Sequence, residues 1–446
     1  MNTPICDFVR SYCHSKSLRL HMPGHKGIVR IGPEAKDITE IPGADSLFEA
    51  SGIIRQSEKN AGKLFGCDTF YSTEGSSLCI RAMIYLCMLY AKSQGQKPLI
   101  AAGRNAHKTL LSAAAMWDMD IHWLYPKQAD SYLSCNLTPE ELEDYLATTS
   151  LPPIAVYLTS PDYLGTMVDI QKIAQICHRH QILLVVDNAH GAYLKFLEKS
   201  MHPMDLGADL CCDSAHKTLP ALTGGAYLHI SSNAPKLFTK HAKAAMGMVG
   251  STSPSYLLLQ SLDALNPYLE KEYPDALRSF IPQVRSCKER LKQTGFTLIA
   301  DEPLKWTIDC KAYGYRGNDV ADWLSAHGII CEFSDPDYLV MMLTPELGPE
   351  GLHHVTKVLC SMKRLTPILE TPPAMIQCRR TLSPREAAMS LSEVLPVEQC
   401  NGRILADPSV GCPPAVPRLV SGEEITERAI AAFQYYGITH CRVCIK

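Results

Sequence analysis

Four short polar clusters hold most of the side chains that could do chemistry. They follow apolar runs of the chain and comprise residues 105–107, 159–163, 187–190 and 213–218. If those runs are parallel strands, their carboxyl ends lie at one edge of a sheet, where α/β proteins bind ligands. The last cluster contains Lys217, whose amine can hold a carbonyl cofactor as a Schiff base.

The clusters match the chemical needs of pyridoxal phosphate (PLP). Lys217 supplies an amine, and Asp187 follows an apolar run as a carboxylate that could keep the pyridine nitrogen protonated. Residues 72–77, Ser-Thr-Glu-Gly-Ser-Ser, run into an expected helix at 78–90, and a helix start rich in hydroxyls suits a phosphate. Ser214 and His216 could add donors from a second direction.

Each feature also has an ordinary structural explanation when taken alone. A serine-rich turn before a helix is commonly an N-cap, and an aspartate after a strand often caps the next helix. His107 and His190 could both be structural histidines. The joint occurrence of these residues at successive strand ends favours a PLP site.

Short buried strands separated by helices would position these residues. Apolar runs without polar alternation occur at 98–102, 153–158, 182–186, 208–212 and 225–230. Helical patterns lie between them at 110–117 and 170–178. Such strands are typical of a mostly parallel sheet covered on both faces, so we expect an α/β fold.

The sequence changes character near residue 267, which indicates a second domain. We expect a charged helix at 270–291, a helix at 318–327 and strands at 297–300, 304–308, 329–333 and 339–343. Residues 367–374 form a proline-containing linker. The expected division is an N-terminal arm plus large domain at 1–266, a small α+β domain at 267–365 and a C-terminal segment at 366–446.

Composition excludes several classes of protein. The 446 residues are 46% apolar, and 43 basic against 46 acidic residues give a net charge of −3, which argues against disorder and against nucleic-acid binding. No apolar run approaches the roughly 18 residues needed to cross a bilayer. Residues 1–18 lack the apolar run of a signal peptide, so we expect a cytoplasmic protein.

The 18 cysteines have no regular spacing. Cys211 and Cys212 lie near His216, and Cys441 and Cys444 form a CxxC at the C-terminus. Neither cluster has the second ligand pair that a four-ligand zinc site requires. We therefore expect reduced thiols and no metal.

Further motifs flank the four clusters. They are residues 21–27 (His-Met-Pro-Gly-His-Lys-Gly), 37–40, 42–47, 104–108, 159–165, 186–191, 214–219, 252–256, 261–263 and 382–387. With these motifs the chain resembles the Orn/Lys/Arg decarboxylase family of fold-type-I PLP enzymes, particularly its shorter bacterial members. The resemblance runs from residue 21 to 230 and continues more weakly to 430.

The resemblance implies a role for each matching residue. Lys217 corresponds to the Schiff-base lysine, Asp187 to the partner of the pyridinium nitrogen and His107 to an imidazole stacked on the ring. The implied phosphate ligands are Ser76, Ser77, Ser214 and His216, with Thr252 and Ser253 contributed by a neighbouring subunit. At least a homodimer, with active sites at its interface, is expected.

The implied reaction is decarboxylation of lysine, arginine or ornithine to an amine used in polyamine synthesis. Lys217 or His190 would return a proton to the substrate carbon. Glu332, on the expected strand 329–333, is the candidate for the substrate's distal cation. Alternatives are a PLP-dependent lyase or aminotransferase acting on another amino acid, with Arg316 as a carboxylate ligand, and a catalytically silent PLP-fold regulatory protein.

Four positions depart from the family pattern. Glu74 puts a negative charge in the phosphate turn, and Asn188 stands where an acid is common. Gly224-Gly225 replaces a more polar pair, and Asn266 stands in place of an expected arginine. A receiver-like wing is absent, so assembly into decamers is not expected.

Overall fold

The computed structural model describes residues 1–15, 17–128, 131–299, 302–408 and 414–445. Its elements divide into two units, residues 1–94 with 183–278 and residues 95–182 with 279–446. The domain boundaries expected at residues 266 and 365 stay predictions.

The first unit contains four strands in the order β1-β7-β6-β5. They are β1 (Asp68–Ser72), β5 (Leu183–Asp187), β6 (Leu210–Asp213) and β7 (Ala226–Ile230). β5 and β6 are parallel, with Asp187 opposite Cys212, whereas β7 is antiparallel to both β6 and β1. Because β5 and β6 are parallel, the polar clusters that follow them lie at the same edge of the sheet.

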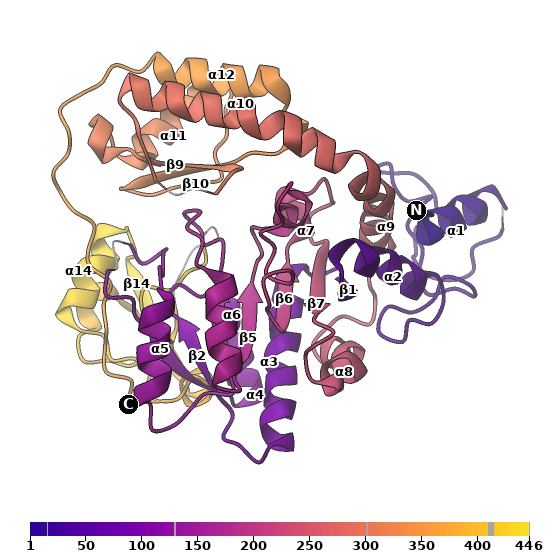
Figure 1. Ribbon diagram of the computed structural model, residues 1–446, viewed down its shortest axis with the longest axis horizontal. Coiled ribbons are helices and arrows are strands. Elements are labelled where there is room, and N and C mark those ends of the chain that lie inside the picture. The colour runs from indigo at the N-terminus through magenta and orange to yellow at the C-terminus, as the bar shows by residue number, and fades with distance from the viewer. Residues whose placement is uncertain (16, 129–130, 300–301, 409–413, 446) are drawn as a thin grey trace. The chain divides into compact units, whose positions relative to one another are not determined.

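Helices of the first unit surround these strands. They are α1 (Pro4–His14), α2 (Ile53–Phe65), α3 (Gly75–Ser93), the 3-10 helix η1 (Ala192–Phe196), α7 (Ala215–Thr218), α8 (Lys236–Gly247) and α9 (Tyr256–Lys271). α3 packs on β6 and β7 and against α8, and α1, α2 and α9 pack together (Figure 1).

The charged helix expected at 270–291 is present as α10 (Tyr273–Thr294), with its start shifted by three residues. The preceding helix, α9, ends at Lys271. Pro274 lies in the first turn of α10, where its missing N–H is tolerated, but the same proline opposes continuation of α9.

The second unit begins with a parallel sheet. β2 (Leu99–Gly103) pairs in parallel with β3 (Asp120–Leu124) and β4 (Ala155–Thr159). The helices in this part are α4 (Lys108–Trp117), α5 (Pro139–Thr148) and α6 (Ile170–Arg179). The expected α/β architecture with mostly parallel strands is therefore confirmed, and β1 and β3 are strands that the sequence pattern did not indicate.

An antiparallel sheet in the order β10-β11-β9-β8 follows in the second unit. Its elements, in chain order, are β8 (Thr297–Ile299), β9 (Lys305–Asp309), η2 (Lys311–Tyr313), α11 (Gly317–Ala326), β10 (Phe333–Ser334), β11 (Tyr338–Met342), η3 (Pro345–Leu347) and α12 (Gly348–Cys360). Ala300, at the end of the expected strand 297–300, lies outside the described residues. The strand expected at 329–333 is wrong, because only Phe333 of that run pairs with β11.

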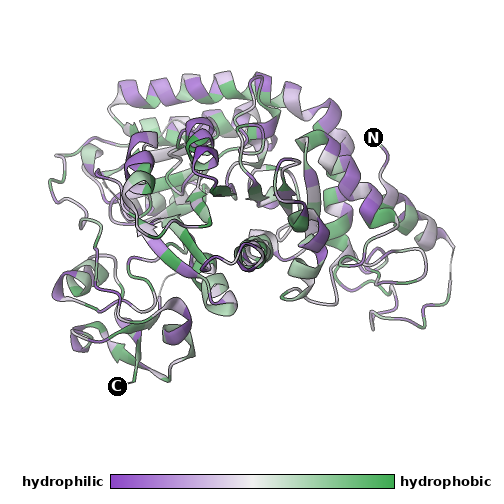
Figure 2. Cartoon of the chain, turned by 60° about the horizontal axis from the view of Figure 1, so that its bottom comes forward, coloured by the Kyte–Doolittle hydropathy of each residue, from purple (hydrophilic) through white to green (hydrophobic). Residues whose placement is uncertain are grey.

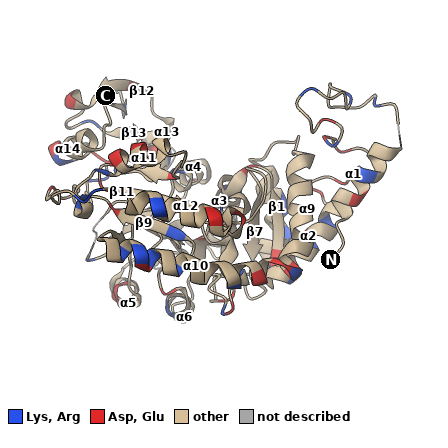
Figure 3. Ribbon diagram, turned by 90° about the horizontal axis from the view of Figure 1, so that it is seen from above, with Lys and Arg blue, Asp and Glu red and all other residues tan. Residues whose placement is uncertain are grey.

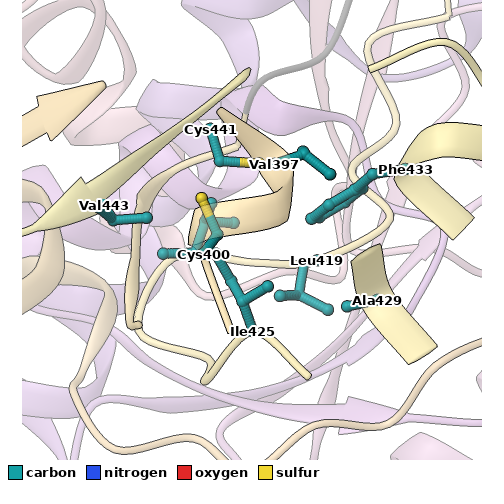
Figure 4. Close-up of a cluster of buried hydrophobic side chains, with 9 residues drawn as sticks. Val397, Cys400, Leu419, Ile425, Ala429, Phe433, Cys441 and Val443 are labelled. Carbon is teal, nitrogen blue, oxygen red and sulfur yellow. The ribbon is translucent and has the colours of Figure 1, made fainter. Parts of the chain in front are cut away.

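The C-terminal part of the second unit has its own small core. Its elements are α13 (Pro384–Met389), β12 (Ser392–Pro396), η4 (Val397–Gln399), β13 (Leu405–Asp407), α14 (Glu427–Tyr435) and β14 (His440–Cys444), with strand order β12-β14-β13. Figure 4 shows Cys400 and Cys441 among the aliphatic side chains of this core. All 17 cysteines that the structure describes are free.

Residue character follows this arrangement. Every residue of β2, β5, β6 and β7 is buried, and Figure 2 shows strands mostly in the apolar colour and helices in both colours. Figure 3 shows acidic and basic residues interspersed along α10. Among the described residues, none of the helices combines the length and apolar character of a membrane span.

Candidate active site

Lys217 lies next to a histidine at the edge of the first unit's sheet. It belongs to α7, which begins two residues after β6 ends, and its Nζ is 2.9 Å from Nε2 of His190. His190 is buried and follows β5, so the neighbouring parallel strand ends bring the two side chains together. An amine and an imidazole at this distance can share a proton, which is the arrangement that general acid–base chemistry requires.

Asp187 is a buried carboxylate at the end of β5, and the residue is only 2% exposed. Its Oδ1 accepts hydrogen bonds from the backbone N–H of Ala189 at 3.2 Å and from Sγ of Cys212 at 3.6 Å. A buried carboxylate is favoured in its charged form when a cation lies next to it. The buried Asp187 carboxylate therefore suits a protonated heterocyclic nitrogen as its neighbour.

Two serine hydroxyls meet at the start of α3. Ser76 and Ser77 lie in the first turn of this helix, and Oγ of Ser214, which follows β6, donates to Oγ of Ser76 at 2.8 Å. The first backbone N–H groups of a helix have no intrahelical acceptor and attract anions. Hydroxyls from two segments at a 19-residue helix start form a cradle for a phosphate group.

The Gly224-Gly225 pair brings the loop after Lys217 against this cradle. The carbonyl of Gly224 accepts from the backbone N–H of Gly75 at 2.8 Å, and Nδ1 of His216 donates to the carbonyl of Gly225 at 2.9 Å. Gly224 has φ +100°, a backbone conformation that side-chain-bearing residues rarely adopt. The glycines at this departure from the family pattern therefore permit the close approach.

Glu74 is bonded to the turn between α8 and α9. It is exposed, and its Oε1 accepts the backbone N–H of Ser251 at 2.7 Å. Thr252 and Ser253 are exposed in the same turn between α8 and α9. Glu74 immediately precedes α3, so this bond holds the turn with the two predicted phosphate ligands, Thr252 and Ser253, near the start of α3 in the same chain.

His107 belongs to the second unit, where it is the N-cap of α4. Its Nδ1 accepts the backbone N–H of Thr109 at 3.1 Å and lies 2.8 Å from the hydroxyl Oγ1 of that residue. Because Nδ1 accepts from a backbone donor, Nε2 carries the proton of the neutral ring. This bonding fixes the ring orientation, and stacking on a cofactor stays a prediction.

Glu332 lies in an irregular segment rather than on the expected strand. Its Oε1 accepts the hydroxyl of Tyr163 at 2.9 Å, and its backbone N–H bonds to the carbonyl of Val340. Tyr163 belongs to the polar cluster that follows β4, so both residues are in the second unit. The structure gives Glu332 a specific partner that the sequence pattern did not indicate.

The sequence pattern also missed a buried network in the first unit. Asp213 accepts hydrogen bonds from His202, His229 and Asn188. The sequence contains one indication of this network, because His229 is the one histidine in the otherwise apolar or aromatic run of β7. His202 lies in an irregular segment with no comparable signal.

Comparison with known proteins agrees with these features. The family model described as Orn/Lys/Arg decarboxylase, major domain, matches residues 3–300. An arginine decarboxylase of Bacillus subtilis (strain 168) is 26% identical and one of Halalkalibacterium halodurans is 28% identical, each aligned over 96% of this chain and 92% of the relative. A lysine decarboxylase of Francisella novicida has a TM-score of 0.79 at 16% identity, covering 99% of this chain and 81% of that chain, which shows a shared fold.

Proposed function

The chain belongs to the Orn/Lys/Arg decarboxylase family, and we propose that it removes the α-carboxylate of lysine, arginine or ornithine as CO2 with PLP as its cofactor. The observation that carries the proposal is the contact between Lys217 and His190, with Asp187 buried at the adjoining strand end. This set combines an amine, a proton relay and a buried acid at one sheet edge.

The residues present fit PLP. Lys217 would hold the cofactor through its amine, and Asp187 would lie at the ring nitrogen. Ser76, Ser77, Ser214 and the first N–H groups of α3 would hold the phosphate, with His216, Thr252 and Ser253 as further ligands and His107 stacked on the ring. When bound, PLP supplies an acceptor for the electron pair that remains when CO2 leaves.

The protein's own side chains supply the proton chemistry. Asp187 holds a proton on the ring nitrogen, because a buried carboxylate next to a cation in a poorly solvated site keeps that cation charged. The Lys217–His190 pair returns a proton to the substrate's α-carbon through either Nζ or Nε2. Glu332 is the proposed partner of the substrate's distal cation, in exchange for its bond to Tyr163.

We propose a homodimer in which the N-terminal segment at 18–31 is covered. Leu18, Leu20 and Ile31 are 84%, 84% and 87% exposed, and Met22, Ile28 and Val29 are exposed as well. Several exposed apolar side chains within one short segment are typical of an interaction surface. The exposed turn at 251–253 leaves Thr252 and Ser253 accessible to a second chain.

A cytoplasmic role in polyamine synthesis is part of the proposal. The products would be cadaverine, agmatine or putrescine, according to the substrate. The free cysteines of the described chain support a reducing compartment, where thiols persist.

The aminotransferase alternative finds less support. Arg316, its candidate carboxylate ligand, is bound through Nη2 to Oε2 of Glu370 at 2.8 Å. Incubation of the PLP-loaded protein with lysine, arginine, ornithine and neutral amino acids, with CO2 and amine measured, tests the proposal. CO2 from one basic amino acid supports it, whereas keto acid without CO2 indicates a transaminase, and no product indicates a silent protein.

A further inference from the structure

Asp213 lies beneath the proposed site, on the opposite face of the sheet from Asp187. Cys212 is opposite Asp187 in the β5–β6 pairing and its Sγ bonds to the Asp187 carboxylate, so both project from one face. Successive side chains of a strand alternate between faces, and Asp213 therefore projects from the other. The side chains of Asp213, His202 and His229 are fully buried.

Both carboxylate oxygens of Asp213 are bonded. Oδ2 accepts from Nε2 of His202 at 3.0 Å and from Nε2 of His229 at 3.1 Å. Oδ1 accepts from Nδ2 of Asn188 at 2.6 Å. Burial by itself raises the pKa of Asp213, but the two histidines lower it overall, so the carboxylate is ionised.

The second ring nitrogens assign the protons of the two histidines. Nδ1 of His202 accepts the backbone N–H of Met204 at 3.3 Å, so Nε2 is the nitrogen that donates to Asp213. Nδ1 of His229 instead lies 2.9 Å from Oγ1 of Thr69, a hydroxyl that can accept. His229 can therefore carry two protons and pair with Asp213 as a cation.

The same bonding argues against a metal at this place. His202, Cys211 and Asp213 lie close enough together to suggest a metal site. A metal on Nε2 of His202 would require Nδ1 to carry the proton, which would then oppose the backbone N–H of Met204. The cluster is an ion pair with additional donors.

The network reaches the proposed active site through Asn188. Asn188 lies between Asp187 and His190 in the turn 187–190. Its backbone N–H donates to the carbonyl of Cys212 at 3.0 Å. The carboxylate of Asp213 can only accept, which fixes the orientation of the Asn188 amide. Oδ1 of Asn188 has no hydrogen-bond partner within the described chain, so the bond to Asp213 is what holds this side chain.

We propose that Asp213 is a positioning residue for the reaction: it holds Asn188 and, through it, the turn 187–190, so that Asp187 and His190 keep their places at the site. Asn188 and Asp213 form a matched pair, because an acid at position 188 would oppose the Asp213 carboxylate in a buried environment. The catalytic meaning of this pair rests on the proposed function, whereas its control of the turn does not.

The first test is Asn188→Ala, which removes the link and leaves Asp213 with both histidines. Hydrogen exchange is measured on the PLP-free protein, so that the result does not depend on the cofactor. We expect amide exchange in the turn 187–190 to rise at least about tenfold while α9 is unchanged. Native exchange in the turn of the folded variant overturns the proposal, even if the wild type binds no PLP.

Charge exchange supplies the second test. Asp213→Asn and Asn188→Asp should each weaken PLP binding by about tenfold or more, the latter by opposing two carboxylates. In the double variant, the amide introduced at position 213 can donate to the new carboxylate at position 188 while its oxygen accepts from the histidines. PLP affinity should return to within about threefold of the wild type. Additive losses in the double variant contradict the matched pair.

Asp263→Asn is a matched control, because Asp263 is another fully buried carboxylate of the first unit. It accepts the backbone N–H groups of Ile5 and Cys6 at 2.9 Å and has no contact with the turn 187–190 among its hydrogen bonds. This variant should lower thermal stability with native exchange in the turn and native PLP affinity. If Asp263→Asn lost amide protection in the turn and PLP affinity to the same extent, the effect of Asp213 would be a general loss of stability, and the proposal would be overturned.

Discussion

Nζ of Lys217 lies 2.9 Å from Nε2 of His190, although the two residues are 27 positions apart in the chain. The contact exists because β5 and β6 are parallel neighbours whose following segments meet at one edge. It places a proton relay directly at the predicted cofactor lysine, and it makes His190 a candidate for the proton donor after CO2 release.

Replacement of His190 by glutamine should lower kcat by about 10²-fold or more, because a positioned acid contributes on this scale. KM and PLP binding should change little, since glutamine keeps a polar group next to Lys217. Steady-state kinetics with PLP titration measure both quantities. His241→Gln, in α8, is the control, and a native kcat in His190→Gln would make Lys217 the sole donor.

Replacement of Asp187 by asparagine should lower kcat by at least about 10³-fold, or about 4 kcal/mol of barrier, because a neutral amide cannot hold the ring nitrogen's proton. The variant retains the shape of the side chain, so a folded protein is expected. Rate measurements at saturating PLP separate this effect from weaker binding. Asp205→Asn on the surface should retain the native rate, and equal rates in both variants would remove Asp187 from its role.

Removal of either hydroxyl of the Ser76–Ser214 pair should weaken PLP binding by about 10- to 100-fold, the value of a hydrogen bond to a charged group. Absorbance titration of Ser76→Ala and Ser214→Ala measures this affinity. Ser93→Ala, at the far end of the same helix, should leave it unchanged. Native affinity in both of the first variants would place the phosphate elsewhere.

The Asp213–His229 pair should give stability that depends on pH. Burial alone lowers the pKa of His229, but Cys67 and Asp213 raise it overall. The stabilisation that His229 gives to the folded state is therefore complete below the unfolded pKa of about 6.5, and it is lost as pH rises through the folded pKa. Because the pKa of Asp213 is lowered in the folded protein, the stabilisation from its carboxylate is complete above about pH 4 and is lost at more acidic pH. Tyr227 and Cys211 also face this network.

Urea unfolding of the wild type and of His229→Gln from pH 4 to pH 9 measures this dependence. The difference in unfolding free energy should be largest between about pH 4 and 6.5 and should fall at higher pH. A difference that is constant across the range would mean that His229 is neutral in the folded protein.

Much of the first unit could be predicted from the sequence because three of its strands, β5, β6 and β7, are mostly apolar. β5 and β6 matched runs without polar alternation, and the polar residues at their ends contain the candidate site. The antiparallel direction of β7 was not predictable from composition, since buried parallel and antiparallel strands are equally apolar. The connection from β6 to β7 has one described helix of four residues, α7, which is too short for a crossover helix.

The remaining differences have local causes. The run 329–333 contains adjacent isoleucines typical of a strand, but Ile330 is 82% exposed and pairs with nothing in the described sheet. β1 and β3 begin with aspartate and mix polar with apolar residues, so they lack the continuous apolar signal. The bond between Asn188 and Asp213 depends on strand pairing, which spacing along the chain does not reveal.

Borohydride reduction of the PLP-treated protein, followed by peptide mapping, measures most directly whether Lys217 holds the cofactor. We expect the reduced cofactor to be attached to Lys217, and we expect Lys217→Ala to take up no label and to release no CO2 from lysine, arginine or ornithine. Attachment to another lysine, or native CO2 release by Lys217→Ala, would contradict this expectation.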